Sequence, residues 1–302
     1  MKIRVFLNRH SGTMRSLGIE AAERVIIPEL ERAGHAVTVE GVTGESLAQR
    51  LDAVVAEAKA GGGPKAVVIG GGDGSVSTAA GRLAGTGVAL GVLPLGTMNL
   101  FARSLGMPID FEEAVRTLAT AEPRPADIAE VNGRLFIHQL GFGVQPHMAR
   151  VRRRALVGGK AGKLFATARA LFTVFRRPRV MRLTLVEDGT ETPVAATGLV
   201  VSNSLYGAGH LPFADDPADG RLGVYVCTSR AFGDLLQLTT AVVRGTWRDD
   251  PRISVTSATD LVIKGRSSTL AVTVDGELER VDLPARVMKR PGALTVLAAP
   301  RG

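Results

Sequence analysis

Apolar and polar positions repeat with two different periods along the first hundred residues. Apolar runs of strand length cover 3–7, 35–40, 66–69 and 88–93, and stretches with helical spacing cover 19–33, 46–60 and 76–83. Gly34 closes the first helical stretch, and a turn at 61–64 closes the second. This alternation predicts a parallel sheet covered by helices, an α/β fold of Rossmann-like type.

The pattern changes after about residue 127. Short segments rich in β-branched residues follow at 180–186, 195–201, 222–227, 252–257, 261–264, 269–274 and 293–297, with turn residues between them. Short strands at this spacing are typical of an antiparallel β-sandwich. We therefore expect two domains, over 1–125 and 126–288, with a boundary near 123–127 and a C-terminal segment over 289–302.

One segment, 149–182, fits neither pattern because it is rich in Arg and Lys and contains no acidic residue. Apolar residues recur in it at helical spacing, at Leu164, Phe165, Ala168, Leu171, Phe172 and Phe175, and Pro178 follows. The favoured interpretation is a helix that packs its aromatic face on a sheet. The alternative is a basic amphipathic helix that touches anionic lipid, and the two can coexist on different faces.

The composition narrows the class of protein. The 302 residues carry a formal net charge of +8 and are 45% apolar, so we expect packed cores and an anionic partner: nucleotide, nucleic acid or membrane surface. Aromatic residues make up only 4%, which disfavours nucleic acid. The single cysteine, Cys227, excludes a disulfide framework, and no apolar run has the length of a membrane span. A cytoplasmic protein is expected.

The stretch VVIGGGDGSVS at 67–77 is the first candidate for chemistry. Glycines between a strand and a helix let backbone N–H groups converge on an anion, as at many phosphate sites. A carboxylate beside phosphate repels it unless a cation intervenes, so Asp73 indicates Mg²⁺. The plainer alternative is a glycine turn with Asp73 as a solvated helix cap. Neither the P-loop motif nor the dinucleotide-binding fingerprint occurs in the chain.

Two further loops share the predicted edge of the sheet. The stretch GVLPLGTMNLFAR at 91–103 is another strand followed by a polar turn, with Thr97 and Asn99 available as donors. The loop after the first strand, NRHSG at 8–12, carries small polar residues. Since parallel strands place their carboxyl ends side by side, these loops are expected to meet at one crevice.

These stretches together resemble the catalytic domain of the diacylglycerol kinases, most of all the bacterial lipid kinases related to sphingosine kinases. The resemblance rests on GGDGS at 71–75 and PLGTMN at 94–99, with NRHSG at 8–12 where the family usually has N-P-x-S-G. It continues in family order with Asp127, VNG at 131–133, Phe136, GFG at 141–143, Asn203, GAG at 207–209, PADGRL at 217–222, VDGE at 274–277 and Pro284. It covers nearly the whole chain.

The resemblance implies a nucleotide domain followed by a β-sandwich, an active site in the cleft between them, and final residues, 293–299, that return to the first domain. It implies a nucleotide site for ATP made of Asn8, Ser11, Gly12, Gly71, Gly72, Gly74, Ser75, Thr78, Thr97 and Asn99. It also implies that Asp73 works with Mg²⁺ and that Glu277 is the general base for the acceptor hydroxyl. By spacing alone, Glu277 reads as a solvated hairpin acid.

A structural Mg²⁺ is implied as well, near Asp219, with backbone carbonyls at Asp216 and Arg221, while Asp127 belongs to the acidic network of the other metal. Two departures bear on these assignments. Leu100 stands where the family often has an Asp near Mg²⁺, and Gly223 stands where relatives often carry a polar residue. Ser75 replaces the family's usual Thr and keeps the hydroxyl.

The leading functional hypothesis is an ATP-dependent, Mg²⁺-dependent lipid kinase that works at an anionic membrane surface as a peripheral protein. The acceptor is open among diacylglycerol, monoacylglycerol, sphingoid bases, ceramide and phosphatidylglycerol. One alternative is an NAD kinase, which shares the GGDG motif; another, suggested by Leu100, is a nucleotide- and lipid-binding protein without catalysis. An edge strand of the second domain offers a route to a homodimer.

Overall fold

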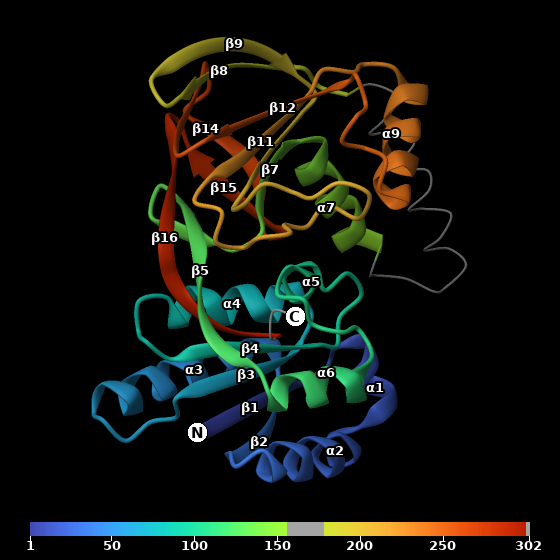
Figure 1. The fold of residues 1–302 in the computed structure, drawn as a ribbon. Coiled ribbons are helices and arrows are strands. Elements are labelled where there is room, and N and C mark those ends of the chain that lie inside the picture. The colour runs from blue at the N-terminus through green and yellow to red at the C-terminus, as the bar shows by residue number, and fades with distance from the viewer. Residues whose placement is uncertain (156–177, 300–302) are drawn as a thin grey trace. The chain divides into compact units, whose positions relative to one another are not determined.

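The computed structural model describes residues 1–155 and 178–299, which divide into two compact units (Figure 1). Unit 1 comprises 1–128, 214–219 and 290–299, and unit 2 comprises 129–155, 178–213 and 220–289. The order is an α/β unit with a mostly parallel sheet, followed by an antiparallel β unit, which confirms the predicted fold class.

Unit 1 is built on four parallel strands in the order β2-β1-β3-β4. These are β1 (Lys2–Asn8), β2 (Ala36–Val42), β3 (Ala66–Gly71) and β4 (Ala89–Pro94). All residues of β3 and β4 are buried, because helices cover both faces of a parallel sheet, and this explains their continuous apolar sequence. The end of β16 (Ala285–Ala298) lies beside β4 and parallel to it, with Val296 opposite Leu90.

Six helices connect and flank these strands: α1 (Gly12–Leu17), α2 (Ile19–Arg32), α3 (Gly44–Lys59), α4 (Asp73–Leu83), α5 (Leu100–Ser104) and α6 (Phe111–Ala119). Helices α3 and α4 pack together on one face of the sheet, and α2 and α6 on the other (Figure 1). Helix α3 begins at a capping box, in which the Thr43 side chain accepts from Ser46 N and the Ser46 hydroxyl accepts from Thr43 N.

Unit 1 is completed by two segments that come from late in the chain. Asp127 N donates to Pro217 O at 2.9 Å, and Gly292 N donates to Asp127 Oδ1, also at 2.9 Å. Asp127 is only 2% exposed, so its carboxylate is held by these neighbours inside the unit. Residues 126–128 and 214–219, which the sequence pattern assigned to the second domain, are therefore counted with unit 1.

Unit 2 contains two groups of antiparallel strands. One is a sheet in the order β12-β11-β10-β7-β14-β15, made of β12 (Ile253–Ala258), β11 (Leu222–Cys227), β10 (Gly198–Ser202), β7 (Gln139–Gly143), β14 (Thr269–Val274) and β15 (Glu277–Asp282). The other joins β9 (Thr190–Ala196), β8 (Met181–Glu187), β13 (Asp260–Gly265) and the first part of β16, with β5 (Glu122–Val131) and β6 (Arg134–Phe136) beside it. The predicted strand at 195–201 is in fact two strands, since β9 ends at Ala196 and β10 begins at Gly198.

One hydrophobic core joins the two groups of strands. Leu185 and Ile263 from the second group pack in the same buried cluster as Phe142, Leu199 and Val272 from the first. Packing of two inner faces into one core is the arrangement of a β-sandwich. A smaller cluster of Tyr206, Tyr225 and Trp247 lies under α9 (Phe232–Arg244), a helix that the strand pattern did not predict.

Helix α7 (Val144–Ala155) begins the basic segment, but the apolar helix predicted over 164–175 lies outside the described residues. Within the described parts of the chain, none of the helices combines the length and the apolar character needed to span a bilayer.

Candidate functional site

The carboxyl ends of three neighbouring strands in unit 1 bring the predicted loops together. Leu7 of β1 lies opposite Gly70 of β3, and Gly71 of β3 lies opposite Pro94 of β4. The loops that follow therefore start at the same edge of the sheet, where parallel α/β folds bind ligands. The glycine-rich stretch is less of a loop than predicted, because Gly70 and Gly71 end β3 and α4 already begins at Asp73.

Asn8 and Ser75 join the first and second of these loops. Asn8 Nδ2 donates to Ser75 Oγ at 2.9 Å, and Asn8 Oδ1 accepts from His10 N at 3.0 Å. Asn8 thus fixes the turn that it begins and also the hydroxyl of Ser75. Since Ser75 Oγ accepts from Asn8, the Ser75 O–H is left to donate elsewhere, at the first turn of α4.

Ser11 is the feature of this edge that most directly indicates a ligand. The residue is 8% exposed, and its Oγ is buried without a hydrogen-bond partner among the described residues. It precedes α1 but does not cap that helix with its side chain. A buried hydroxyl without a partner costs free energy, and a bound ligand with a polar atom at this position would offset that cost.

The glycines of these loops are required by close approach of backbone to backbone. A Cβ added to Gly96 would lie 2.4 Å from Gly72 Cα and 2.9 Å from Asn99 Oδ1. A Cβ on Gly71 would lie 2.9 Å from Ser75 Cβ. Any side chain here would push apart the two loops that follow β3 and β4.

Asp73 links the second loop to the third. Its half-buried carboxylate accepts from Phe101 N at 3.4 Å, in the first turn of α5. Only one oxygen is engaged in this way, so the carboxylate suits Mg²⁺, which binds one or two protein carboxylates and completes its shell with water and phosphate oxygens. Leu100, beside Phe101, is half-buried and places no second carboxylate here.

Asn99 shapes the third loop through its own backbone contacts. It adopts a left-handed conformation with φ 51° and ψ 44°. Its Oδ1 accepts from Gly96 N at 2.9 Å, and its Nδ2 donates to Pro94 O at 3.2 Å and to Gly96 O at 3.0 Å. The amide is used within the loop, so we expect Asn99 to act on a nucleotide through the shape of this loop.

The other predicted nucleotide residues occupy the same edge with freer side chains. Thr78 Oγ1 donates to Gly74 O at 3.0 Å, one turn back along α4. Thr97 is exposed, and Gly12 has open space where a Cβ would point. A nucleotide role for these residues stays a prediction.

Arg103 is a residue of this edge that motif reasoning missed. Its Nε donates to Met98 O at 3.1 Å, which holds the guanidinium against the loop at 94–99. Its remaining N–H groups have no partner in the described parts of the chain. The signal was available in the sequence, since Arg103 is the only cation within five residues of Asn99.

The residues predicted for a structural metal take part in hydrogen bonds of their own, and Arg221 O, one of the predicted carbonyl ligands, accepts from Lys289 Nζ at 3.3 Å. Asp216 Oδ1 accepts from Ala218 N at 3.0 Å in unit 1, whereas Arg221, in unit 2, donates from Nε to Ser257 Oγ at 2.9 Å. No group of three His, Cys, Asp or Glu side chains suited to a metal occurs among the described residues. A metal at 216–221 therefore stays a prediction.

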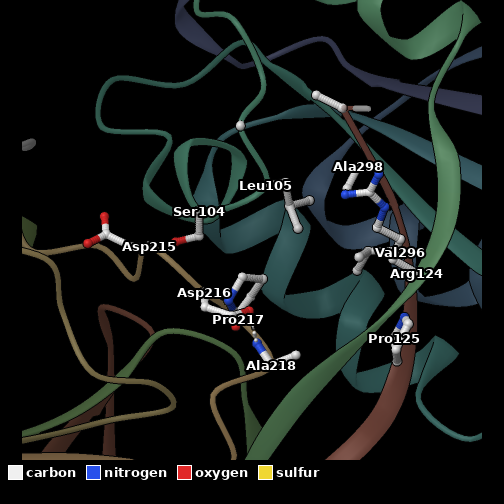
Figure 2. Close-up of a pocket in the computed structure, with 12 residues that line it drawn as sticks. Ser104, Leu105, Arg124, Pro125, Asp215, Asp216, Pro217, Ala218, Val296 and Ala298 are labelled. Carbon is white, nitrogen blue, oxygen red and sulfur yellow. Dashed lines mark hydrogen bonds between the residues drawn. The ribbon is translucent and has the colours of Figure 1, made fainter. Parts of the chain in front are cut away.

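A cavity of about 530 Å³ lies within unit 1, beside the 214–219 segment (Figure 2). Its walls come from the end of α5, the start of β5, this segment and the end of β16, including Ser104, Arg124, Asp216, Pro217 and Ala298. Ser104 Oγ accepts from Ala214 N at 3.2 Å, which ties α5 to the segment. Asp216 and Ser104, at the C-terminal end of α5, line the same cavity. At the N-terminal end of α5, Phe101 N donates to Asp73.

The turn that carries Glu277 is fixed by its neighbour in unit 2. Asp275, with φ 48°, accepts from the backbone N–H groups of Ile137, His138 and Gln139 at 2.9–3.0 Å. Glu277 itself is exposed at the start of β15, and its carboxylate has no partner among the described residues. It is accessible as a base, and that role stays a prediction.

A buried polar chain adjoins this turn, and nothing in the sequence signalled it. Tyr206 OH donates to Gln139 Oε1 at 2.8 Å, Gln139 Nε2 donates to Gln145 Oε1 at 3.3 Å, and Thr273 Oγ1 donates to the same oxygen at 3.2 Å. Burial raises the pKa of the Tyr206 hydroxyl well above its usual range, so it remains a neutral donor. The chain locks α7 to β7 and β14.

Comparison with known proteins first defines the class. Residues 2–131 match the diacylglycerol kinase catalytic domain, and residues 142–298 match the YegS C-terminal NAD kinase beta sandwich-like domain. The two matches follow each other as the α/β and β units do. The chain belongs to the bacterial family of diacylglycerol kinases and YegS-like lipid kinases.

Individual relatives agree with this assignment. A diacylglycerol kinase of Mycobacterium tuberculosis (strain ATCC 25618 / H37Rv) is 29% identical over 319 residues, covering 100% of this chain and 96% of the relative. A probable lipid kinase, YegS-like, from Pseudomonas syringae pv. tomato is 45% identical over 102 residues, 32% of each chain. The crystal structure of a diacylglycerol kinase from Bacillus anthracis str. Sterne shares the fold, with a TM-score of 0.71 at 18% identity, covering 99% of this chain and 97% of that one.

Proposed function

We propose that this protein is a Mg²⁺-dependent lipid kinase that transfers the γ-phosphoryl group of ATP to a lipid hydroxyl. The family supports the reaction class, and the observation that carries the nucleotide site is the buried hydroxyl of Ser11, which lacks a partner among the described residues. That hydroxyl lies on the loop that Asn8 ties to the first turn of α4. A phosphate or ribose oxygen would supply the missing partner.

Positioning and charge neutralisation are the main needs of phosphoryl transfer. The first turn of α4 offers backbone N–H groups and the Ser75 O–H, and Asn8 ties this turn to the loop that carries Ser11, which suits a chain of phosphates. Arg103 adds a fixed positive charge beside the third loop. When bound, Mg²⁺ would neutralise charge on the phosphate oxygens, and Asp73 is the residue that would hold it.

The acceptor hydroxyl must lose its proton as its oxygen bonds to the γ-phosphorus and the bond to the leaving ADP oxygen breaks. We propose Glu277 as the base that takes this proton. Its carboxylate is exposed to solvent, and Asp275 holds the turn in place by three backbone hydrogen bonds. The lipid acceptor also implies peripheral contact with an anionic membrane.

The deciding experiment measures transfer of label from γ-labelled ATP into a mixed lipid extract with Mg²⁺ and anionic vesicles. We expect label in one lipid class, which also identifies the acceptor. Asp73→Asn and Glu277→Gln should each lower the rate by at least about a hundred-fold, in line with the loss of a metal ligand or a general base. Two exposed carboxylates serve as matched controls, through Glu45→Gln in unit 1 and Asp249→Asn in unit 2, and should leave the rate unchanged.

Other outcomes point to the alternatives. Full activity of both Asp73→Asn and Glu277→Gln would refute the assigned roles. Label in NADP when NAD replaces the lipid would establish the NAD kinase instead. Tight ATP binding without transfer to any lipid would favour a binding protein, and Leu100→Asp would then test whether the missing carboxylate is the cause.

A further inference from the structure

A second cavity, of about 460 Å³, lies in unit 2 at strands β8, β9 and β13. Three of its lining residues are cations, Arg182, Lys264 and Arg266, and all three are exposed. Pro193 and Ala195 add apolar side chains on the same face, since they lie opposite Thr184 and Arg182. We call this cavity the basic pocket.

The register of the strands places the cations of the basic pocket next to one another. Lys264 of β13 lies opposite Thr184 of β8, so their side chains share a face of the sheet. Arg182 is two residues before Thr184 and shares that face too. Arg266 and Arg182 follow one step beyond the last pair of this ladder, Gly265 with Leu183. The two arginines thus come from the adjoining ends of neighbouring strands, where both line the basic pocket.

The charge of the basic pocket is only partly compensated by the protein. Lys264 Nζ forms an ion pair with Glu191 Oε1 at 2.6 Å. Neither the Arg182 nor the Arg266 guanidinium has an ion pair or hydrogen bond within the parts of the chain that the structure describes. Like charges in one pocket repel each other, and an anion between them would relieve that cost.

We propose that the basic pocket binds the phosphate head group of an anionic phospholipid in a membrane surface. Guanidinium groups suit phosphate because they donate two parallel hydrogen bonds. The apolar atoms of Pro193 and Ala195 suit the glycerol and first methylenes of a lipid, which inorganic phosphate lacks. Arg182 also ends a segment, 149–182, with eleven Arg and Lys and no acidic residue, so the positive charge continues along the chain.

This proposal rests on the proposed function in one respect, because it locates the membrane contact that a lipid kinase needs. The pocket differs from the acceptor site, since no residue assigned to chemistry lines it. Its role would be to hold the protein on the membrane where the acceptor is embedded.

The test is sedimentation of the full-length protein with vesicles, without ATP. The vesicles contain phosphatidylcholine alone or phosphatidylcholine with phosphatidylglycerol. We expect Arg182→Ala with Arg266→Ala to weaken binding to the anionic vesicles about thirty-fold, since each cation near an anionic surface contributes about five-fold. Arg182→Lys with Arg266→Lys keeps the charge and should retain most of the binding. Circular dichroism checks that each variant is folded.

The matched control is Arg230→Ala with Arg244→Ala, which removes the same charge from exposed positions of unit 2 outside the pocket. We expect it to weaken binding less than about three-fold. Equal losses for the two pairs would overturn the proposal, because general surface charge would then explain the binding. Calorimetric binding of soluble glycerol 1-phosphate as tight as vesicle binding would overturn the membrane as the source of the head group.

Failure of the kinase assignment would look different. Asp73→Asn should bind anionic vesicles as the unmodified protein does, whether or not it transfers phosphate. A protein that binds vesicles through the pocket but phosphorylates no lipid would leave the basic pocket standing and remove the proposed function. A protein that phosphorylates lipid while the double alanine variant binds vesicles normally would do the reverse.

Discussion

Replacement of Ser11 by alanine should change stability and nucleotide affinity in opposite directions. In the free protein, Ser11 Oγ is buried without a partner among the described residues, a situation that costs about 1–3 kcal/mol. Alanine removes the oxygen and keeps the methylene, so the free energy of unfolding should rise by about 1 kcal/mol. In the complex, a hydrogen bond to a charged phosphate worth about 1.5–3 kcal/mol would be lost, which is about ten- to a hundred-fold in Kd.

The assay pairs thermal unfolding with calorimetric titration of Mg²⁺ and ATP. Ser11→Ala should raise Tm by about 2–4 °C and weaken ATP binding. Ser16→Ala is the control in the helix that follows, because the exposed Ser16 hydroxyl donates to Thr13 O at 2.9 Å and faces solvent. Its effects should stay within about 0.5 kcal/mol. A lower Tm for Ser11→Ala together with unchanged ATP affinity would show that the hydroxyl serves the fold, and the reasoning would be wrong.

Three further predictions concern the loops and turns described above. Gly96→Ala should destabilise the protein by about 1–3 kcal/mol and weaken ATP binding, because the added Cβ would lie 2.4 Å from backbone. Gly81 lies inside α4 with open space around it, so Gly81→Ala should stabilise the protein by about 0.5–1 kcal/mol. Both free energies of unfolding are measured by denaturant titration. Asp275→Ala should lower the free energy of unfolding by about 2–4 kcal/mol, since three backbone N–H groups lose their acceptor. Asp282 is exposed at the far end of the hairpin, so Asp282→Ala should have little effect. Equal losses for the two variants in urea titrations would contradict this prediction. The pKa of Asp188 is lowered by hydrogen bonds from the Asp260 N–H and from Thr259. The stability that Asp188 contributes is therefore fully present above its unfolded pKa of about 3.9, and it is lost as the pH falls through the lower pKa of the folded protein. Asp188→Asn should therefore flatten the acid limb of stability against pH, and an unchanged limb would count against this assignment.

The architecture of the first unit could be predicted because its signals are local. The fully apolar runs of β3 and β4 have the composition of central parallel strands, and the helices between them have regular periodicity. Helix α4 was placed three residues late, since Asp73 and Gly74 are weak helix formers inside a glycine run. The close packing of the neighbouring loops, and not the helix propensity of these residues, sets the start of α4 at Asp73.

Features that depend on distant residues could not be predicted in this way. No sequence pattern places 214–219 within the first unit, because the connection is made by two hydrogen bonds, from Asp127 N to Pro217 O and from Ala214 N to Ser104 Oγ. The same holds for the break between β9 and β10, where both sides of the break have strand composition. The period of apolar residues identifies strand-forming sequence, but it does not show where one strand ends and the next begins.

Within the candidate site, the sequence predicted which residues gather there, but it did not predict which hydrogen bonds each side chain makes. The motif includes Asn99 as a polar residue available to a nucleotide, yet its amide is used by its own loop. Ser11 was included as one polar residue among several, and only the structure shows that its hydroxyl lacks a partner. Arg103 lies outside the motif and was missed.

The pairing of Val296 with Leu90 joins positions more than 200 residues apart. During synthesis, one edge of β4 therefore stays without a partner strand until β16 has left the ribosome. Contacts of such long range in sequence also form slowly. A bare strand edge is a template for association with other chains. Ribosome-bound chains that stop before residue 290 should thus depend on chaperones, and the α/β unit cannot be excised as one continuous stretch of sequence.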